Sequence, residues 1–276
     1  MPALGLDPAQ YGKAIETAGF GSVWFPEVNS PESLEPLAAV LAATSGLIVG
    51  TGIASVWTWE PAELAARADE LAGRYPGRFV LGLGNSHASM VESLGQAYEK
   101  PYSKMVRFLD ALPPTQAPVV LAALGPKMLR LAGERAVGAH PYFVPPEHTA
   151  FARRTLGPEP LLIPEVAVAL APGADGEAHA RASATYSLRL PNYTSNLKRL
   201  GYTDEDISNG GSARLISAII PYGTQAPAER IRQHLDAGAD HVLVQPLGAD
   251  GFAPGDLEKL AAVVADLPGP SPSRLS

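Results

Sequence analysis

Short apolar segments alternate with helical segments along almost the whole chain, and this alternation limits the folds that it can adopt. Phe79–Gly84 and Val119–Ala123 are typical of the apolar segments. Neither shows the alternation of polar and apolar residues that marks a sheet with one face in water. Continuously apolar strands separated by helices are typical of a parallel sheet that is covered on both faces. The sequence therefore predicts an α/β protein.

The number and order of the expected strands favour a barrel. A helix from Pro8 to Ala18 comes before any strand, which a doubly wound open sheet does not require. The pattern fits a (β/α)₈ TIM barrel that lacks its first strand better. We expect that the true start lies upstream of Met1 or that residues 1–6 fill the gap irregularly. The expected strands lie at 22–25, 47–53, 79–84, 119–123, 138–144, 165–170 and 241–245.

Residues 174–220 are too long for one plain crossover and are predicted to form several helices. We interpret them as a helical insertion after the seventh strand position, which partly covers the barrel mouth and selects the substrate. Residues 1–267 are then a single domain. The proline- and serine-rich residues 268–276 are expected to be a flexible tail.

Composition excludes several classes of protein. The net charge of -7 argues against a surface for nucleic acid or anionic membranes. The chain has no cysteine, which excludes disulfides and thiolate chemistry and fits a cytoplasmic protein. No apolar run is long enough to span a bilayer. The six histidines show no metal-ligand spacing, so we expect no metal. A small molecule is the expected partner.

Val119–Met128 has the pattern of an anion site. An apolar strand stops at Gly125, and Pro126 suits the first position of a helix because it has no N–H to satisfy. The N–H groups that follow would point out of the helix N-terminus toward an anion, with Lys127 beside them. An ordinary strand–turn–helix is the alternative interpretation of this stretch alone.

In a barrel, functional residues lie at the carboxyl ends of the strands. Glu27 is a candidate base there, and His87 is a candidate proton donor that could instead tie down its own loop. His140 precedes a proline and could simply pack beside the sheet. The strand ends supply Glu27, Gly52, Ile53, Asn85, Ser86, His87, Leu124, Gly125, Pro126, His140, Pro141, Tyr142 and Gln245.

Other conspicuous residues are weaker candidates for the functional site. Trp57 and Trp59 could wall a planar ligand or form a structural cap over the mouth. His148, His179 and His234 fall on helical stretches, where we expect them at the surface. Gly82–His87 begins like a dinucleotide fingerprint but lacks its third glycine, and no GxSxG motif is present.

Several stretches in this order resemble the bacterial luciferase-like superfamily. They are Leu47–Pro61, Gly77–Gly84, Leu124–Met128 with Gly138–His140 downstream, and Asp236–Val242. The sequence is most similar to the actinobacterial deazaflavin-dependent oxidoreductases of that superfamily. The resemblance covers nearly the whole chain.

The resemblance implies a TIM barrel that binds a deazaflavin coenzyme of the F420 type, or FMN, across its mouth. It implies a bulge, often with a non-prolyl cis peptide, behind the flavin ring at Gly52–Ile53, and a phosphate at Leu124–Met128. His87 matches an acid that follows the fourth strand in relatives. Dimers are common in the family, so a homodimer is a prediction. The implied cofactor contacts are Gly52, Ile53, Asn85, Ser86, Leu124, Gly125, Pro126, Lys127, Met128, His140 and Tyr142.

One departure from the family bears on mechanism. Sugar-phosphate dehydrogenases of the family carry an Asp-His pair after the second strand, where this chain has Glu27-Val28. The leading hypothesis is an oxidoreductase that transfers hydride between a deazaflavin and a small organic substrate, with His87 and Glu27 as catalytic residues. An FMN-dependent monooxygenase and a non-catalytic flavin-binding protein are alternatives. A phosphate-binding isomerase or aldolase barrel ranks last, because no lysine stands at a strand end.

Overall fold

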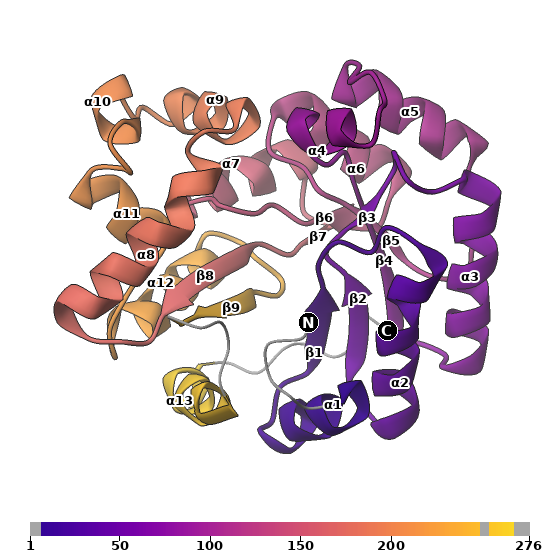
Figure 1. Cartoon of the computed structure of the whole chain (residues 1–276), viewed down its shortest axis with the longest axis horizontal. Helices are drawn as coiled ribbons and strands as arrows, with labels where there is room; N and C mark the ends of the chain where they lie inside the picture. The colour runs from indigo at the N-terminus through magenta and orange to yellow at the C-terminus, as the bar shows by residue number, and fades with distance from the viewer. Residues whose placement is uncertain (1–6, 249–253, 268–276) are drawn as a thin grey trace. The chain divides into compact units, whose positions relative to one another are not determined.

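A computed structural model describes residues 7–248 and 254–267 (Figure 1). The described residues form two compact units. The N-terminal unit comprises residues 7–123 and 127–140, and the C-terminal unit comprises 124–126, 141–248 and 254–267. The predictions of an irregular segment at 1–6 and of a tail at 268–276 lie outside the described residues.

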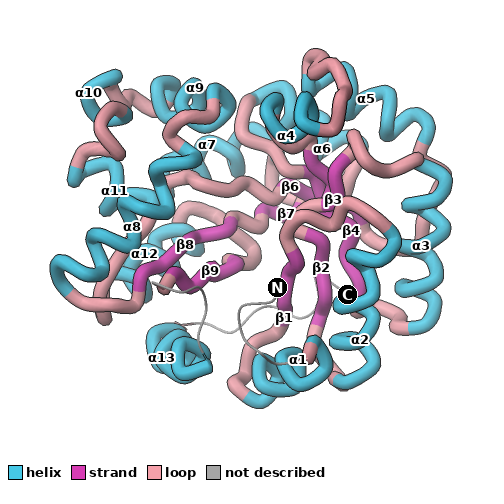
Figure 2. The backbone as a smooth tube through the Cα atoms, viewed as in Figure 1, coloured by secondary structure: helices cyan, strands magenta, loops and turns pink. Residues whose placement is uncertain are grey.

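The N-terminal unit is a parallel sheet with helices between its strands (Figure 2). Its neighbouring strands pair in the order β1-β2-β4-β5-β6, and β3 also pairs with β4, always in parallel. The strands are β1 (Ser22–Phe25), β2 (Ile48–Thr51), β3 (Ala54–Ser55), β4 (Phe79–Gly84), β5 (Val119–Leu121) and β6 (Gly138–Ala139). The helices are α1 (Pro8–Thr17), η1 (Pro31–Leu34), α2 (Glu35–Ala43), α3 (Pro61–Arg74), α4 (Ala88–Ser93), α5 (Pro101–Ala111) and α6 (Pro126–Arg135).

Local sequence signals explain where these helices begin. Asp7 caps α1, because its side chain accepts hydrogen bonds from the N–H groups of Ala9 and Gln10. A proline stands in the first turn of α1, α2, α3 and α5, where its missing N–H leaves no bond unmade. The apolar faces of these helices then pack on the sheet, and all six residues of β4 are buried.

The expected strand at 47–53 is shorter in the structure: β2 ends at Thr51, and the separate strand β3 follows at Ala54–Ser55. Thr51 causes the break, because its Oγ1 donates to the carbonyl of Gly82 and accepts from the N–H of Gly82, both at 2.8 Å. The side chain of Thr51 thus takes the place of a backbone partner. A Cβ on Gly82 would lie 2.0 Å from the carbonyl oxygen of Thr51, so only glycine allows this approach. The family resemblance implied a bulge here, and the structure shows an interruption between Thr51 and Ala54.

The C-terminal unit contains two longer parallel strands and the remaining helices. Its strands are β7 (Leu161–Leu162), β8 (Glu165–Ala169) and β9 (Leu243–Leu247), and β8 pairs with β9 from Glu165 opposite Leu243 to Ala169 opposite Leu247. Its helices are α7 (Pro146–Leu156), α8 (Gly173–Ser187), α9 (Pro191–Arg199), α10 (Asp204–Ile207), α11 (Ala213–Ile219), α12 (Ala226–Asp236) and α13 (Pro254–Val264).

The segment 174–220 is helical, as predicted, and comprises α8 to α11. Its core packs against β8 of the same unit, where Ala167 and Ala169 leave room for larger side chains. Leu197, Leu215 and Ile216 of the insertion are almost fully buried in this cluster. Burial of apolar surface on β8 therefore holds the insertion in place.

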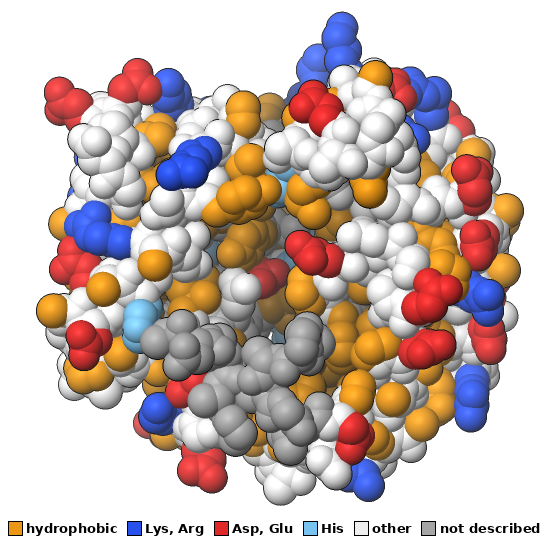
Figure 3. Space-filling model, in the orientation of Figure 1, with side chains coloured by type: hydrophobic (Ala, Val, Ile, Leu, Met, Phe, Trp, Pro, Cys, Tyr) orange, Lys and Arg blue, Asp and Glu red, His pale blue; other side chains and the backbone are white. Residues whose placement is uncertain are grey.

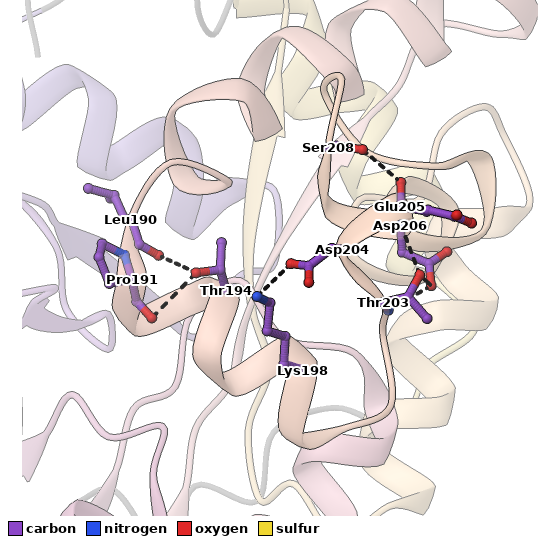
Figure 4. A network of polar contacts seen from close by, with 9 residues as sticks. All are labelled: Leu190, Pro191, Thr194, Lys198, Thr203, Asp204, Glu205, Asp206 and Ser208. Carbon is purple, nitrogen blue, oxygen red and sulfur yellow. Dashed lines mark hydrogen bonds and ion pairs between the residues drawn. The ribbon is translucent and has the colours of Figure 1, made fainter.

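Polar contacts fix the connection between α9 and α10 (Figure 4). Lys198 Nζ lies 2.5 Å from Asp204 Oδ1 and so ties the end of α9 to the start of α10. Thr203 and Asp206 form a capping box, in which each side chain accepts from the backbone N–H of the other residue. Residues 200–203 are thus anchored at both ends.

Two predicted strands have different bounds in the structure. The strand expected at 138–144 ends at Ala139, because Pro141 has no N–H to donate to a ladder. The strand expected at 241–245 begins at Leu243, and β7 was not expected. Within the described residues, no helix combines the length and the apolar composition that crossing a membrane requires.

Candidate functional site

The strand exits of the N-terminal unit lie beside one another. The N–H of Gly52 donates to the carbonyl of Phe25 at 2.7 Å, and the N–H of Val28 donates to the carbonyl of Ile53 at 3.1 Å. The exit of β1, which carries Glu27, is therefore bonded directly to the segment Gly52–Ile53. The peptide bond between Gly52 and Ile53 is cis, as the family resemblance implied.

The exit of β4 reaches the same edge. Ser86 Oγ donates to Ser55 Oγ at 2.8 Å, and Ser55 belongs to β3, just beyond Ile53. A Cβ on Gly84 would lie 2.5 Å from the side chain of Ile53, so β4 and Ile53 are in close contact. The structure thus brings together Glu27, Gly52, Ile53 and Ser86, which the sequence named separately.

Left-handed backbone conformations mark three of the strand exits. Glu27 has φ 53° directly after β1, Ser86 has φ 50° after β4, and Phe143 has φ 58° after β6. Such values are uncommon for residues other than glycine, and they gather at functional sites. This recurrence points to the carboxyl ends of the strands as the functional edge of the molecule.

His87 follows Ser86 and stands at the N-cap of α4. Its carbonyl accepts from the N–H groups of Met90 and Val91, both at 3.0 Å, while its side chain makes no capping bond. The backbone carbonyl of His87, and not its side chain, therefore makes the hydrogen bonds at the start of α4. Its imidazole is partly buried.

His140 lies inside the N-terminal unit and beside Gly52. It is 3% exposed, its ring centroid lies 5.1 Å from that of Trp24, and its Nε2 would be 3.6 Å from a Cβ on Gly52. His140 packs as a core residue and yet borders the cis segment. Both interpretations from the sequence, packing and ligand contact, thus remain compatible with its position.

Three buried side-chain atoms of this unit make no hydrogen bond with the described residues: Trp24 Nε1, Trp57 Nε1 and Asn85 Oδ1. Trp24 Nε1 is a donor and Asn85 Oδ1 is an acceptor, and neither has a partner among the described residues. A buried polar atom without a partner is rare, because it loses its bonds to water. A ligand that offers both an acceptor and a donor would satisfy this pair of atoms.

The tryptophans at 57 and 59 are packing residues. Trp59 is 5% exposed and its Nε1 donates to the carbonyl of Val28 at 2.8 Å. Trp57 stacks on Tyr98 with ring centroids 5.3 Å apart, and Lys104 Nζ lies 4.7 Å from its ring. Of the two interpretations, these contacts favour the structural cap.

In the C-terminal unit, the loop Leu124–Pro126 meets an arginine that the sequence did not single out. Arg199 Nη2 lies only 3.9 Å from the position of a Cβ on Gly125, with no other atom that close. Arg199 Nη1 donates to Asn196 Oδ1 at 2.8 Å, which orients the guanidinium. A positive charge thus stands beside open space at the start of α6, whereas Lys127 is exposed.

His148 supports the same loop. Its Nε2 lies 2.9 Å from the carbonyl oxygen of Leu124 and must donate to it. Burial, together with a smaller contribution from the charge of Arg199, lowers the pKa of His148 to about 4. Its imidazole is therefore neutral at physiological pH and holds the loop by a hydrogen bond rather than by charge.

The expectation that His148 and His234 lie at the surface is wrong. Both are fully buried, and Thr149 Oγ1 forms a 2.8 Å hydrogen bond with Nδ1 of His234. This contact joins α7 to α12 across 85 positions of sequence. His179, by contrast, is partly exposed.

Tyr142 heads an aromatic and polar cluster in the C-terminal unit. Its hydroxyl donates to Gln245 Oε1 at 3.1 Å, and its ring meets that of Tyr193 edge-on at 6.0 Å. Burial and the carboxylate of Glu165 raise the pKa of Tyr142 and of Tyr193, so both hydroxyls stay protonated. The sequence gave no signal for Tyr193, because it lies in the helical insertion, far from any strand end.

Comparison with known proteins finds similarity over the N-terminal part of the chain. A family model of luciferase-like monooxygenases matches residues 7–113. Residues 7–113 are a luciferase-like domain. The chain is 28% identical to a 5,10-methylenetetrahydromethanopterin reductase of Methanolobus tindarius over 48% of its own length and 49% of the relative. It is 32% identical to a putative coenzyme F420-dependent oxidoreductase of Mycobacterium tuberculosis over 47% of its length and 38% of the relative.

Solved structures extend the likeness in fold to almost the whole chain. An F420-dependent secondary alcohol dehydrogenase with an F420-acetone adduct aligns with a TM-score of 0.71, 16% identity and coverage of 98% and 96%. A Baeyer-Villiger monooxygenase component from Pseudomonas putida, in complex with FMN, aligns with a TM-score of 0.67, 14% identity and coverage of 94% and 91%. These likenesses show the fold, which is the predicted TIM barrel of luciferase-like enzymes. By sequence, however, the chain spans about half the length, or less, of the curated relatives it matches.

Proposed function

We propose that the protein is an oxidoreductase that transfers hydride between a deazaflavin coenzyme and a small organic substrate. The observation that carries the proposal is the strand-exit cluster of Glu27, Gly52–Ile53 and Ser86. The relatives of the chain by sequence include a putative coenzyme F420-dependent oxidoreductase. A cytoplasmic location and a homodimer remain predictions from the sequence.

The residues present fit such a coenzyme. The edge of its ring system carries both hydrogen-bond donors and acceptors. A donor would pair with Asn85 Oδ1 and an acceptor with Trp24 Nε1, neither of which has a partner among the described residues. We assign ring contacts to Gly52, Ile53, Asn85, Ser86 and His140. The phosphate is assigned to the backbone of Leu124 to Met128, where the orphan N–H groups of α6 begin, with Arg199 beside Gly125. Tyr142 completes the assigned set.

The chain's own residues then orient the reactants and handle protons. When bound, the deazaflavin supplies a ring carbon that donates or accepts hydride. His87 is assigned as proton donor or substrate clamp, because it stands at the exit of β4, directly after Ser86. Glu27, exposed and held in a left-handed turn, is the second catalytic candidate. The helices 174–220 are proposed to select the substrate.

Titration of the purified protein with the deazaflavin and, separately, with FMN tests the proposal. We expect binding of the deazaflavin and much weaker binding of FMN. Tight FMN binding with no affinity for the deazaflavin would instead identify an FMN-dependent monooxygenase. Deazaflavin binding without any substrate-dependent change in its absorbance, across a panel of alcohols, aldehydes and enones, would identify a non-catalytic flavin-binding protein.

A pair of arginine variants tests the phosphate assignment. Arg199→Gln is expected to weaken deazaflavin binding about tenfold, because a charge-assisted hydrogen bond is lost. Arg189→Gln is the matched control, since Arg189 is exposed and lies just before α9. Equal affinity of the two variants for the deazaflavin would contradict the assignment of the phosphate.

A further inference from the structure

A cavity of about 410 Å³ opens in the C-terminal unit among α7, α11, α12 and the connection that follows α9. Its volume is in the range of small-ligand sites. Its walls come from helices and from the connection after α9, and they include none of the residues assigned to the deazaflavin. The polar side chains that line it are Glu147, Tyr202, Arg214, Ser217, Arg230 and Gln233.

Arg230 supplies a fixed positive charge to the cavity. Its Nη1 donates to the carbonyl of Ala218 at 2.7 Å and its Nη2 to that of Ser217 at 3.1 Å. These carbonyls belong to the last turn of α11, so Arg230 also caps that helix. Burial lowers the pKa of Arg230, and the carboxylate of Glu147 opposes this effect. An arginine keeps its charge under such conditions.

Arg214 supplies a second positive charge. Its guanidinium carbon lies 4.7 Å from the centre of the Tyr202 ring, and its Nη2 makes one long bond of 3.5 Å to the carbonyl of Gly201. Neither Arg214 nor Arg230 has a carboxylate within 4.0 Å among the residues that the structure describes. Arg232 in the same unit, in contrast, lies 2.7 Å from Glu229. The cavity therefore carries two arginine charges without an ion-pair partner.

The wall beneath Arg214 is held in shape. Tyr202 is 7% exposed and directly precedes Thr203 in the sequence. Figure 4 shows the contacts that fix this stretch, which are the ion pair of Lys198 with Asp204 and the capping box of Thr203 and Asp206. The ring on which Arg214 rests is thus anchored before any ligand arrives. A preorganised wall lowers the conformational entropy that the protein loses when a ligand binds.

The cavity also offers acceptors. Glu147 is exposed at the start of α7, and Gln233 Nε2 donates to Glu229 at 3.1 Å, which leaves its own Oε1 as an acceptor. On the visible face, basic and acidic side chains are likewise interspersed over α9 to α11 (Figure 3). A ligand that fits these walls combines an anionic group with a hydrogen-bond donor.

We propose that this cavity binds a small organic phosphate that carries a hydroxyl group. Arg214 and Arg230 hold the phosphate, whose two negative charges match the two guanidinium groups. Glu147 accepts a hydrogen bond from the hydroxyl. The site is additional to the phosphate contacts proposed at the start of α6, and it stands whether or not the protein binds a deazaflavin.

Calorimetric titration with glycerol 3-phosphate, inorganic phosphate and neutral glycerol tests the proposal. All proteins carry Arg199→Gln, which weakens anion binding beside Gly125. We expect glycerol 3-phosphate to bind, glycerol to give no heat, and Arg214→Gln to weaken binding about tenfold. Arg232→Gln is the matched control and is expected to bind as the parent does. Arg230 is left intact because it also caps α11.

Glu147→Gln provides a variant whose effect a folding defect cannot imitate. Removing the carboxylate takes a negative charge from the site, so inorganic phosphate is expected to bind several-fold more tightly. The preference for glycerol 3-phosphate over inorganic phosphate is expected to fall, because the hydroxyl loses its best acceptor. Equal affinities in Arg214→Gln and Arg232→Gln, or no heat with glycerol 3-phosphate in the parent, would overturn the proposal.

Discussion

His148 shows how a single buried side chain can make the protein sensitive to acid. Its Nε2 donates to the carbonyl of Leu124, so its Nδ1 must stay unprotonated, and Nδ1 is buried without a partner. Protonation would create a buried charge with no acceptor. The pKa of about 4 in the folded protein lies well below the ordinary value of 6.5.

The unfolded chain therefore binds more protons than the folded chain between pH 6.5 and pH 4. The free energy of unfolding should fall as the pH drops through this window, by about 1.4 kcal/mol per pH unit at most for one histidine. His148→Gln keeps a donor toward Leu124 but cannot titrate, so we expect a shallower fall. Urea unfolding at several pH values measures the slope.

The matched control for this prediction is His179→Gln, which removes a partly exposed histidine from α8. We expect it to keep the wild-type slope. His234, whose pKa burial lowers to about 3, contributes to the slope in both variants. An unchanged slope in His148→Gln would contradict the role of this side chain.

At the scale of an element, the contact between Thr51 and β4 depends on the absence of a side chain at Gly82. Gly82→Ala would place a Cβ 2.0 Å from the carbonyl oxygen of Thr51, and neither backbone can move without breaking the sheet. We expect a loss of about 3 kcal/mol or more in the free energy of unfolding. Thermal and urea denaturation measure it.

Gly73→Ala in α3 is the matched glycine variant. No atom lies within 4 Å of a Cβ at this position, and alanine favours helices. The free energy of unfolding is expected to rise by roughly 0.5 kcal/mol. If both variants changed stability alike, the close approach of β2 and β4 would not be the reason for glycine at position 82.

At the start of α6, adding a methyl group to a glycine is expected to change coenzyme affinity rather than stability. A Cβ on Gly125 meets only Arg199, at 3.9 Å, so Gly125→Ala should change the free energy of unfolding by less than about 0.5 kcal/mol. The added methyl group would occupy the space proposed for the phosphate, and deazaflavin affinity is expected to fall about tenfold. Fluorescence titration measures it. Unchanged affinity would place the phosphate elsewhere.

For the whole molecule, a bound coenzyme should stabilise the fold by mass action. A deazaflavin concentration of 100 times its dissociation constant is expected to raise the free energy of unfolding by about 2.7 kcal/mol. Arg199→Gln should need a higher concentration for the same gain. Urea unfolding with and without the deazaflavin measures the effect. Stabilisation by FMN alone would favour the monooxygenase alternative.

Much of the fold was predictable because it follows from local chemistry. Prolines and caps set the helix starts, and continuously apolar runs such as Phe79–Gly84 specify buried parallel strands. The same logic placed Glu27, Gly52 and Ser86 at strand ends, since parallel strands share one carboxyl edge. The break at Thr51 was foreseen only as a bulge, because its cause is a side chain bonded to a strand about thirty residues away.

The sequence by itself determined that this chain would be a barrel of parallel strands with its candidate site at the strand exits. These properties depend on residue types and short spacings. Only the tertiary structure decided that Arg199 stands beside Gly125, that Tyr193 meets Tyr142, and that two histidines expected at the surface are buried. Such contacts join residues far apart in sequence, and their energy comes from burial and charge that no local pattern encodes.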